Sequence, residues 1–169
     1  MQRLLYTIGF TGKTAEEFFT LLSVVGVQEV IDIRQNRGGQ LSGFSKHPDL
    51  SFFLRKIAGI AYLHEPLLAP PLELLKTYRK TKDWPAYEVA FLSVMKGRGV
   101  PEKLDTTSWP SNIALLCSES GPERCHRRLV ADLLVSHWRE CGDAVEIRHL
   151  VTEKKKTAKA HHKRAASVS

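Results

Sequence analysis

The chain is poor in cysteine and has no long apolar run. Its 169 residues include only three cysteines, at positions 117, 125 and 141, and their irregular spacing argues against a disulfide framework. No apolar segment approaches the roughly 20 residues that a membrane-spanning helix needs. The N-terminal segment runs straight into a predicted strand instead of a signal peptide. The sequence therefore predicts a cytoplasmic protein with reduced thiols and no membrane partner.

The body of the chain also lacks a marked excess of either charge. The formal charge of the whole chain is +7, but residues 154–169 contain six Lys or Arg and no Asp or Glu, which leaves 19 basic and 18 acidic residues in 1–153. A tail of this composition is too polar to pack and is expected to be disordered. It either contacts the phosphate backbone of a nucleic acid or is only a solvated end. We therefore predict a single domain over 1–153, followed by a basic tail over 154–169.

Apolar patterning predicts an alternation of strands and helices. Runs of strand length occur at 4–8, 29–34, 59–63, 113–117 and 145–150. About five helical segments lie between them. The first helix has a capping box at Thr14 and Glu17, and the fourth is predicted to begin around Asp83 and to end before Gly97. Connection rules then predict a three-layer α/β fold, with a mainly parallel five-stranded sheet and helices on both faces.

The stretch 111–138 combines a strand, a loop and a helix, and the rest of the chain is arranged around it. Ile113–Cys117 is a continuous apolar run, typical of a strand buried on both faces of a parallel sheet. From Cys125 onwards the apolar residues recur on one helical stripe, and Arg127 falls off that stripe. The pattern places Arg127 at the solvent-facing start of this helix.

The loop between this strand and helix carries more reactive groups than a turn requires. It holds the thiols of Cys117 and Cys125, the carboxylate of Glu119, the imidazole of His126 and the guanidinium of Arg127. In open α/β sheets, ligands bind at the carboxyl ends of strands, where helix N-termini favour anions. We predict catalytic roles for the thiols, the carboxylate and the imidazole, and ligand binding by the guanidinium. The alternative is a solvated basic helix start.

Two charges share one face of the second predicted strand. Val30, Asp32 and Arg34 alternate onto that face, and a buried charge is unfavourable unless it is paired or faces a polar cavity. Because Arg34 lies at the carboxyl end of the strand, we predict that it contacts the ligand and that Asp32 orients it. The alternative is a buried structural ion pair between the two.

The polar, glycine-rich segment 35–47 is predicted to be a loop that acts as a lid. Arg37, Phe44 and Lys46 on this loop are candidates to close over an anionic or planar ligand. Phe44 has a second interpretation, as an anchor that packs the loop on the core. His64, at the end of the third predicted strand, is a weaker candidate, since a lone histidine is more often a structural hydrogen-bond donor.

Five segments resemble, in order and over nearly all of residues 3–150, the domain-of-unknown-function 488 family: YTIGF at 6–10, DIR at 32–34, SGFSK at 42–46, GIAYLHE at 59–65 and Cys-Ser-Glu-(x)₅-Cys-His-Arg at 117–127. The last pattern is the most specific of them. The resemblance implies an α/β fold and no particular activity. The site that it implies consists of Arg34, Cys117, Glu119, Cys125, His126 and Arg127. Phe10 stands where family members tend to have a histidine.

The function favoured by these residues is an enzyme that acts on a phosphate-bearing ligand derived from a nucleotide or nucleic acid. Arg34, Arg127 and the helix N-terminus would bind the phosphate or another oxyanion. Glu119, His126 or a cysteine would then perform acid–base or nucleophilic chemistry. Nearby arginines and a helix N-terminus lower the pKa of a thiol towards the thiolate form, which is the form that a nucleophile needs.

Two other functions are compatible with the sequence. Cys117, Cys125 and His126 include the ligand types of a zinc site, but the cysteines of such sites usually lie two to four residues apart and these are eight apart. We therefore expect no metal and no cofactor. The other alternative is a non-catalytic module that binds a nucleotide or nucleic acid. It requires only the arginines and leaves both thiols as small buried fillers.

Overall fold

The computed structural model describes residues 2–39 and 42–152, so the predicted tail at 154–169 lies outside the described residues. One sheet contains β1 (Gln2–Gly9), β2 (Glu29–Asp32), β3 (Ala61–His64), β4 (Asn112–Cys117) and β5 (Ala144–Leu150). The strand order is β3-β2-β4-β1-β5, and all neighbours run parallel. This arrangement confirms the predicted parallel sheet.

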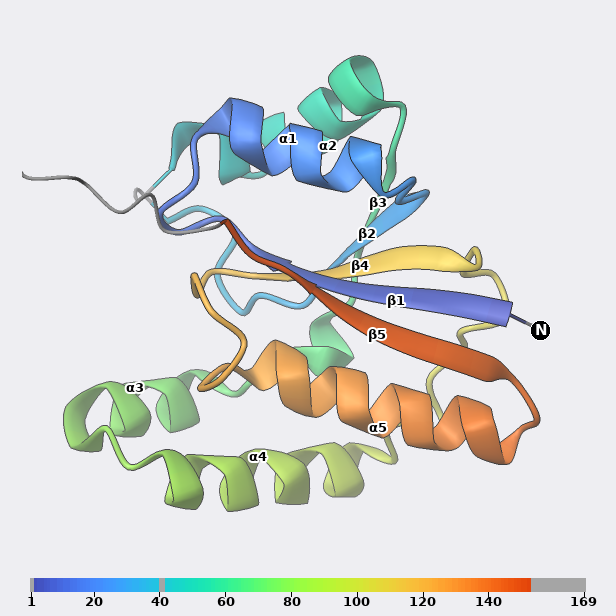
Figure 1. Cartoon of the computed structure of the whole chain (residues 1–169). Coiled ribbons are helices and arrows are strands. Elements are labelled where there is room, and N and C mark those ends of the chain that lie inside the picture. Colours follow the sequence, from blue (N-terminus) through green and yellow to red (C-terminus); the bar gives the residue numbers. More distant parts are fainter. Residues whose placement is uncertain (1, 40–41, 153–169) are drawn as a thin grey trace, which may run out of the picture.

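Helices cover both faces of the sheet (Figure 1). The α-helices are α1 (Ala15–Val24), α2 (Asp49–Phe53), α3 (Leu72–Thr81), α4 (Trp84–Arg98) and α5 (His126–Glu140). The first two lie on one face and the other three on the opposite face. Shorter turns of 3₁₀- or π-helix are η1 (Gly43–Ser45), η2 (Leu54–Ala58) and η3 (Pro66–Leu68). The three-layer α/β fold predicted from the sequence is therefore confirmed.

Local sequence signals explain most of the element ends. The Thr14 hydroxyl accepts a hydrogen bond from Glu17 N (3.1 Å), and the Glu17 carboxylate accepts one from Thr14 N (2.8 Å), which confirms the predicted capping box. The predicted end of the fourth helix is wrong. Helix α4 continues through Gly97 to Arg98 and stops at Gly99, whose left-handed φ of 72° is the conformation that ends helices.

The second strand is shorter than predicted, because the Asp32 side chain takes the hydrogen bond of the Arg34 N–H. It ends at Asp32 instead of Arg34, although the Ile33 N–H still donates to Leu116 O of β4 (3.1 Å). The backbone N–H of Arg34 turns away from the sheet and donates to the Asp32 carboxylate (3.1 Å). A side chain thus replaces the sheet as hydrogen-bond partner at this point.

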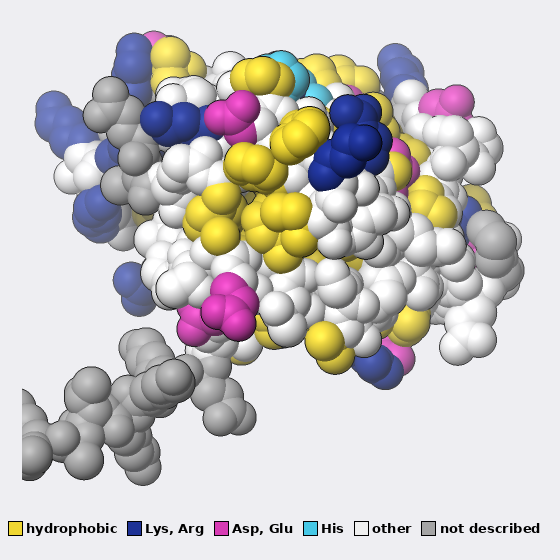
Figure 2. Space-filling view, turned by 90° about the horizontal axis from the view of Figure 1, so that it is seen from above, with side chains coloured by type: hydrophobic (Ala, Val, Ile, Leu, Met, Phe, Trp, Pro, Cys, Tyr) yellow, Lys and Arg dark blue, Asp and Glu magenta, His cyan; other side chains and the backbone are white. Residues whose placement is uncertain are grey.

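The face covered by α1 and η2 carries an apolar hollow. Figure 2 shows hydrophobic side chains gathered around it, and its volume is about 410 Å³. It is lined by Ala15, Glu16, Phe19, Thr20, Phe44, Phe53 and Ile57. Because Glu16 is the only titratable residue in this lining, the hollow lacks the groups that chemistry requires. Separately, no helix within 2–39 and 42–152 combines the length and the apolar character needed to cross a membrane.

The topology creates a crevice between the two central strands. Strand β1 leads to α1 on one face, while its neighbour β4 leads to α5 on the other face (Figure 1). The loops that follow these strands therefore leave the sheet in opposite directions, and open α/β sheets bind ligands at such a switch point. The two loops are tied together by a hydrogen bond from Thr11 N to Ser118 O (3.1 Å).

The last residue of β1, Gly9, allows this close approach. A Cβ atom at position 9 would lie 1.6 Å from the Glu119 carbonyl oxygen and 2.7 Å from Nη1 of Arg127. Both distances are too short for any non-bonded contact. The loop after β4 thus occupies the space that a side chain on β1 would fill.

We predict that Gly9→Ala destabilises the protein by about 1–3 kcal/mol or more, because a backbone carbonyl must move to make room for the methyl group. Gly97→Ala is a matched control, since a Cβ there has nothing within 4 Å and lies inside α4. That control should raise stability by roughly 0.5–1 kcal/mol. Urea unfolding of both variants measures the difference. Equal stabilities would show that Gly9 does not hold the loop in place.

Candidate functional site

Cys117 and Cys125 lie in contact at the centre of the carboxyl edge. Cys117 is the last residue of β4 and Cys125 is the N-cap of α5, and they are 0% and 2% exposed. Their sulfur atoms are 2.8 Å apart, a hydrogen-bonding contact between two free thiols. The Cys117 sulfur also accepts hydrogen bonds from the Glu119 N–H (3.3 Å) and from Nη1 of Arg127 (3.0 Å). The donors of this cluster therefore converge on Cys117.

These contacts separate the two thiols electrostatically. Burial raises the pKa of Cys117. The hydrogen bond from Cys125 and the charge of the Arg127 guanidinium together lower it by more than burial raises it, so the net pKa lies below the ordinary value. At Cys125, burial and the hydrogen bond to Cys117 hold the pKa well above the ordinary value. Of the two thiols, Cys117 therefore ionises first, and Cys125 keeps its proton.

The predicted orientation of Arg127 is wrong, because its side chain is fully buried. Nη1 donates to Glu119 O (2.6 Å) as well as to the Cys117 sulfur, and Nη2 donates to Ser120 O (3.3 Å). The helical stripe classed this position as polar and hence exposed. The loop folds over the helix start, however, and supplies acceptors to Nη1 and Nη2, while the buried Nε has no partner among the described residues. Arg127 therefore holds the loop and stabilises the thiolate.

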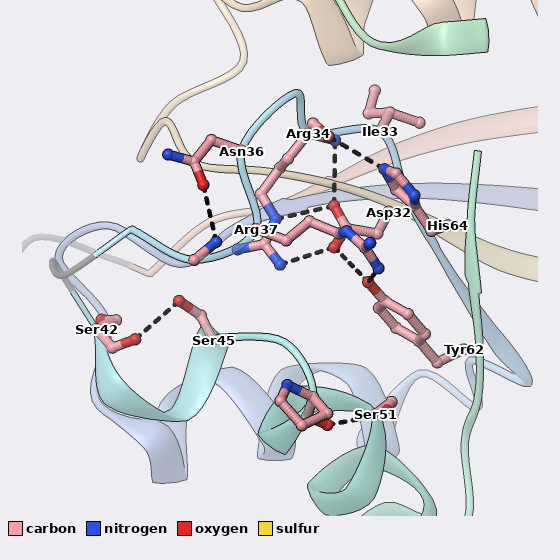
Figure 3. A network of polar contacts seen from close by, with 12 residues as sticks. Asp32, Ile33, Arg34, Asn36, Arg37, Ser42, Ser45, Ser51, Tyr62 and His64 are labelled. Atoms are coloured by element: carbon pink, nitrogen blue, oxygen red, sulfur yellow. Dashed lines mark hydrogen bonds and ion pairs between the residues drawn. The ribbon is translucent and has the colours of Figure 1, made fainter. Parts of the chain in front are cut away.

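A second polar cluster lies at the ends of β2 and β3 (Figure 3). The buried carboxylate of Asp32 accepts from Nε (2.8 Å) and Nη2 (2.7 Å) of Arg34, and also from the hydroxyl of Tyr62 (2.7 Å). This is a two-pronged ion pair, the geometry of the structural alternative. Nη1 of Arg34 donates to no group among the described residues, so this nitrogen remains available to an anion. Burial is the main cause that raises the pKa of Tyr62 to about 12.

Two contacts connect this cluster to the thiol loop. The Arg34 guanidinium lies over the ring of Phe10, 5.3 Å from its centroid, and Phe10 directly follows β1. Nε2 of His126 lies 3.1 Å from the Ile33 carbonyl oxygen, and because a carbonyl only accepts, this nitrogen carries the proton. Burial lowers the pKa of His126 to about 4. His126 is therefore a neutral imidazole that positions α5 against the end of β2.

Lys13 lines a polar hollow beside the thiol loop. The hollow has a volume of about 680 Å³ and is lined by Thr11, Gly12, Lys13, Glu119, Ser120, Gly121, Glu123, Arg124, Val151 and Thr152. The Lys13 side chain is only 7% exposed, and its ammonium, which makes no hydrogen bond or ion pair within the described residues, keeps some access to solvent in the hollow. Burial and the charge of Arg127 lower its pKa, while the charges of Glu17 and Cys117 raise it. An unpaired cation therefore borders the hollow.

Other predicted residues occupy varied positions. Phe44 packs against Phe18 (5.4 Å) and Phe19 (6.0 Å between ring centroids), as the loop-anchor alternative expects. The Glu119 side chain is exposed at the hollow, while its backbone N–H donates to Cys117 and its carbonyl accepts from Arg127. Nη1 of Arg37 donates to the Tyr62 hydroxyl (3.5 Å). The ring of His64 lies 3.3 Å from the Arg34 carbonyl oxygen and so has a structural contact.

The sequence argument missed Lys13, Tyr62 and Tyr87. Tyr87 of α4 is 4% exposed, and its pKa is raised by burial and by the charges of Cys125 and Cys117, so its ring lies close to the thiols. Lys13 had a usable signal, because it lies between the end of a strand and the cap of the next helix, which is the functional edge. The two tyrosines had none, since tyrosine is a common core residue.

The described residues contain no group of three or more His, Cys, Asp and Glu side chains that could hold a metal ion. His126 turns its Nε2 to a backbone carbonyl, and the positive charge of Arg127 lies 3.0 Å from the Cys117 sulfur. Both features disfavour the zinc alternative, since a cation next to a thiolate ligand opposes the binding of a second cation.

We predict that Arg34→Met lowers the free energy of unfolding by about 3–5 kcal/mol, because Asp32 would remain buried without its charged partner. Arg148→Met is the matched control, since Arg148 pairs with Glu146 at 2.8 and 3.0 Å on the exposed surface. There the loss of stability should be much smaller, because the pair is exposed to solvent. Denaturant unfolding at neutral pH compares the two. Equal, small losses would mean that the Asp32–Arg34 pair does not support the fold.

His126 should make folding sensitive to mild acid. The unfolded chain binds a proton at this imidazole below its ordinary pKa of 6.5, while the folded protein binds one only below about 4. The contribution of neutral His126 to stability is therefore complete above pH 6.5 and is lost as the pH falls towards 4. NMR titration of the ring protons should give a midpoint near 4. A midpoint at the ordinary value would contradict the buried, neutral ring.

Comparison with known proteins identifies the family of the chain. No curated protein and no solved structure matches the chain significantly. Residues 14–134 match the family described as Domain of unknown function DUF488. The matched region includes both polar clusters, from Asp32 and Arg34 to Cys117, Cys125 and Arg127, and it spans most of the 169 residues. The chain belongs to the DUF488 family.

Proposed function

We propose that the protein is an enzyme that acts on a phosphate-bearing ligand derived from a nucleotide or nucleic acid, with the Cys117 thiolate as its reactive group. The observation that carries the proposal is that the Cys117 sulfur, which accepts from Arg127, lies at the same switch-point crevice as the ammonium of Lys13, which has no hydrogen-bond or ion-pair partner among the described residues. Perturbed ionisable groups that gather in one crevice favour a functional role.

The hollow beside the thiol loop suits a ligand that carries both an anion and hydroxyl groups. Lys13 and Arg124 line it and supply positive charge, while the exposed carboxylate of Glu119 can accept hydrogen bonds from ribose-like hydroxyls. Lys13 cannot turn away from the hollow as a surface lysine would, because its stem is buried. A phosphate at this position would neutralise a charge that the described residues leave unpaired.

The two thiols provide a nucleophile and a proton donor. In the proposed reaction the Cys117 sulfur forms a bond to the electrophilic atom of the ligand while the bond to the leaving group breaks. The leaving group takes the proton of Cys125. Water then releases the product from Cys117, and the proton of that water returns to Cys125. Because Cys117 is 0% exposed, the reaction requires movement of the loop at 118–124.

A non-catalytic binding module is the second candidate function. It is favoured by the near-complete burial of both sulfur atoms, which is the usual condition of structural cysteines. Such a module would use Lys13 and the free Nη1 of Arg34 to hold a nucleotide or nucleic acid. The predicted contribution of the basic tail to nucleic-acid binding concerns residues outside those described. The enzyme candidate requires reduced thiols, so we also propose a reducing compartment such as the cytoplasm.

We predict that Lys13→Met weakens the binding of phosphate or nucleotides by roughly 1.5–3 kcal/mol, the usual contribution of a charge-assisted hydrogen bond. Its folding stability should stay equal or rise, because a buried unpaired charge becomes apolar. Lys80→Met, on an exposed position of α3, is the control and should change neither property. Calorimetric titration with a panel of nucleotides, combined with thermal melts, measures both. Unchanged affinity in Lys13→Met would refute the anion site.

Cys117→Ser separates the two candidate functions. If the protein is an enzyme, this variant should keep most of its ligand affinity and lose turnover of the bound nucleotide, because a serine hydroxyl is not ionised at neutral pH. Product formation in mixtures of protein and ligand, followed by chromatography, provides the measurement. Binding without turnover in the unmodified protein would instead favour the binding module.

A further inference from the structure

We propose that Cys117 and Cys125 form a reversible intramolecular disulfide when the protein meets a hydroperoxide, so that the site contains an oxidation switch. This inference concerns a modification site and does not rest on the proposed function. It follows from three features of the described residues: the contact between the sulfur atoms, the group that charges one of them, and the loop that joins them.

The first feature is the position of the two sulfur atoms. They face each other at 2.8 Å across the gap between the end of β4 and the start of α5. A disulfide bond measures about 2.0 Å, so its formation requires the sulfur atoms to approach by less than about 1 Å. Sequence residues 118–124 form the loop between them, and Glu119 and Ser120 on this loop are exposed. A short, exposed loop can absorb a movement of this size.

The second feature is the unequal chemistry of the pair. Nη1 of Arg127 (3.0 Å) and the Glu119 N–H (3.3 Å) both donate to Cys117, whereas Cys125 has Arg127 only at 3.6 Å. Because only a thiolate attacks a peroxide, Cys117 is assigned as the attacking sulfur. Cys125 keeps its proton and serves as the second, resolving thiol. Cys117 is thus suited to the attack on the peroxide, and Cys125 to the formation of the disulfide.

The chemistry balances without any further component. The Cys117 thiolate attacks the outer oxygen of the hydroperoxide, and the O–O bond breaks. Cys117 becomes a sulfenic acid, and the peroxide leaves as water or an alcohol after taking one proton from the solvent. The Cys125 sulfur then attacks the Cys117 sulfur and loses its proton, and the sulfenic oxygen leaves as water. Two thiols are oxidised by two electrons in total, and one peroxide is reduced.

Oxidation would change the charge of the site as well as its nucleophile. The disulfide carries no charge, so Arg127 would retain only the neutral carbonyl acceptors of Glu119 and Ser120. Lys13 would also lose its electrostatic attraction to the negative charge of Cys117. The hollow would thus become more positive at the same step that removes the thiolate. A peroxide signal would therefore alter reactivity and anion affinity together.

The test uses the full chain with Cys141→Ser, because Cys141 is exposed and would otherwise form links between molecules. The protein is treated with hydrogen peroxide, its remaining thiols are blocked, and its peptides are mapped by mass spectrometry without reduction. We expect a link between Cys117 and Cys125, with the loss of two hydrogen atoms, and its reversal by dithiothreitol. The absence of this link, with both thiols still free, would overturn the proposal.

Two further variants test the assigned roles. With Cys125→Ser in the same background, Cys117 should accumulate sulfenic and sulfinic acid instead of a disulfide. With Cys117→Ser, Cys125 should remain a free thiol over the same period. The reverse pattern would overturn the assignment of the attacking sulfur. None of these readouts needs a ligand, so they can fail or succeed separately from the proposed function.

The pH dependence of the oxidation rate provides a check on the role of Arg127. A thiol of ordinary pKa, about 8.5, loses about tenfold in rate for each pH unit below neutrality, because its thiolate fraction falls in that proportion. As the pH rises from 6 to 10, the oxidation rate of the protein should level off at a lower pH than that of glutathione measured alongside. Arg127→Lys keeps the charge and should retain part of this difference, while Arg127→Met should lose it. A rate that levels off at the same pH as that of glutathione would overturn the assignment of Cys117 as the attacking sulfur.

Discussion

The burial of one guanidinium group shapes the centre of this protein. Arg127 is 0% exposed, and a buried cation is stable only where acceptors surround it. The Cys117 sulfur and the carbonyl groups of Glu119 and Ser120 are the acceptors of its two terminal nitrogens. The loop after β4 must therefore fold back over the start of α5, and Gly9 must lack a side chain to let it do so. The reactive thiol is thus a consequence of the way in which the fold satisfies a buried charge.

The carboxyl edge of the sheet has two charge clusters, which differ in how completely their charges are paired within the protein. Around Asp32, a carboxylate is saturated by Arg34 and Tyr62, so that most of its hydrogen-bonding capacity is used within the protein. Around Cys117, Lys13 lines the hollow and makes no hydrogen bond or ion pair among the residues described. Phe10 and His126 lie between the clusters and connect them. The first cluster stabilises the frame of the crevice, and the second has unused binding capacity.

Patterns of local origin could be predicted from the sequence, and contacts between distant segments could not. The strands, the capping box at Thr14 and the strand–loop–helix unit over 111–138 follow from periodicity and turn residues. The position of Arg127 was predicted wrongly, because a helical stripe describes the helix alone and says nothing of a loop that covers it. Asp32 and Arg34 were recognised as a pair with two possible roles, and their bidentate contact became visible only with side-chain geometry. Lys13 escaped attention because lysine is rarely buried.

The absence of a side chain at Gly9 has a consequence for folding. Gly9 and Glu119 are far apart in the sequence but lie against each other in the folded protein, so β1 packs beside the loop after β4 because position 9 has no side chain. Pairing between segments so distant in the sequence is intrinsically slow. The acceptors of Arg127 all lie at 117–120, close to it in the chain, and none of them comes from β1. The first strand therefore encloses the cysteine cluster without contributing a hydrogen bond to Arg127, and what it adds to the reactive thiol is its burial.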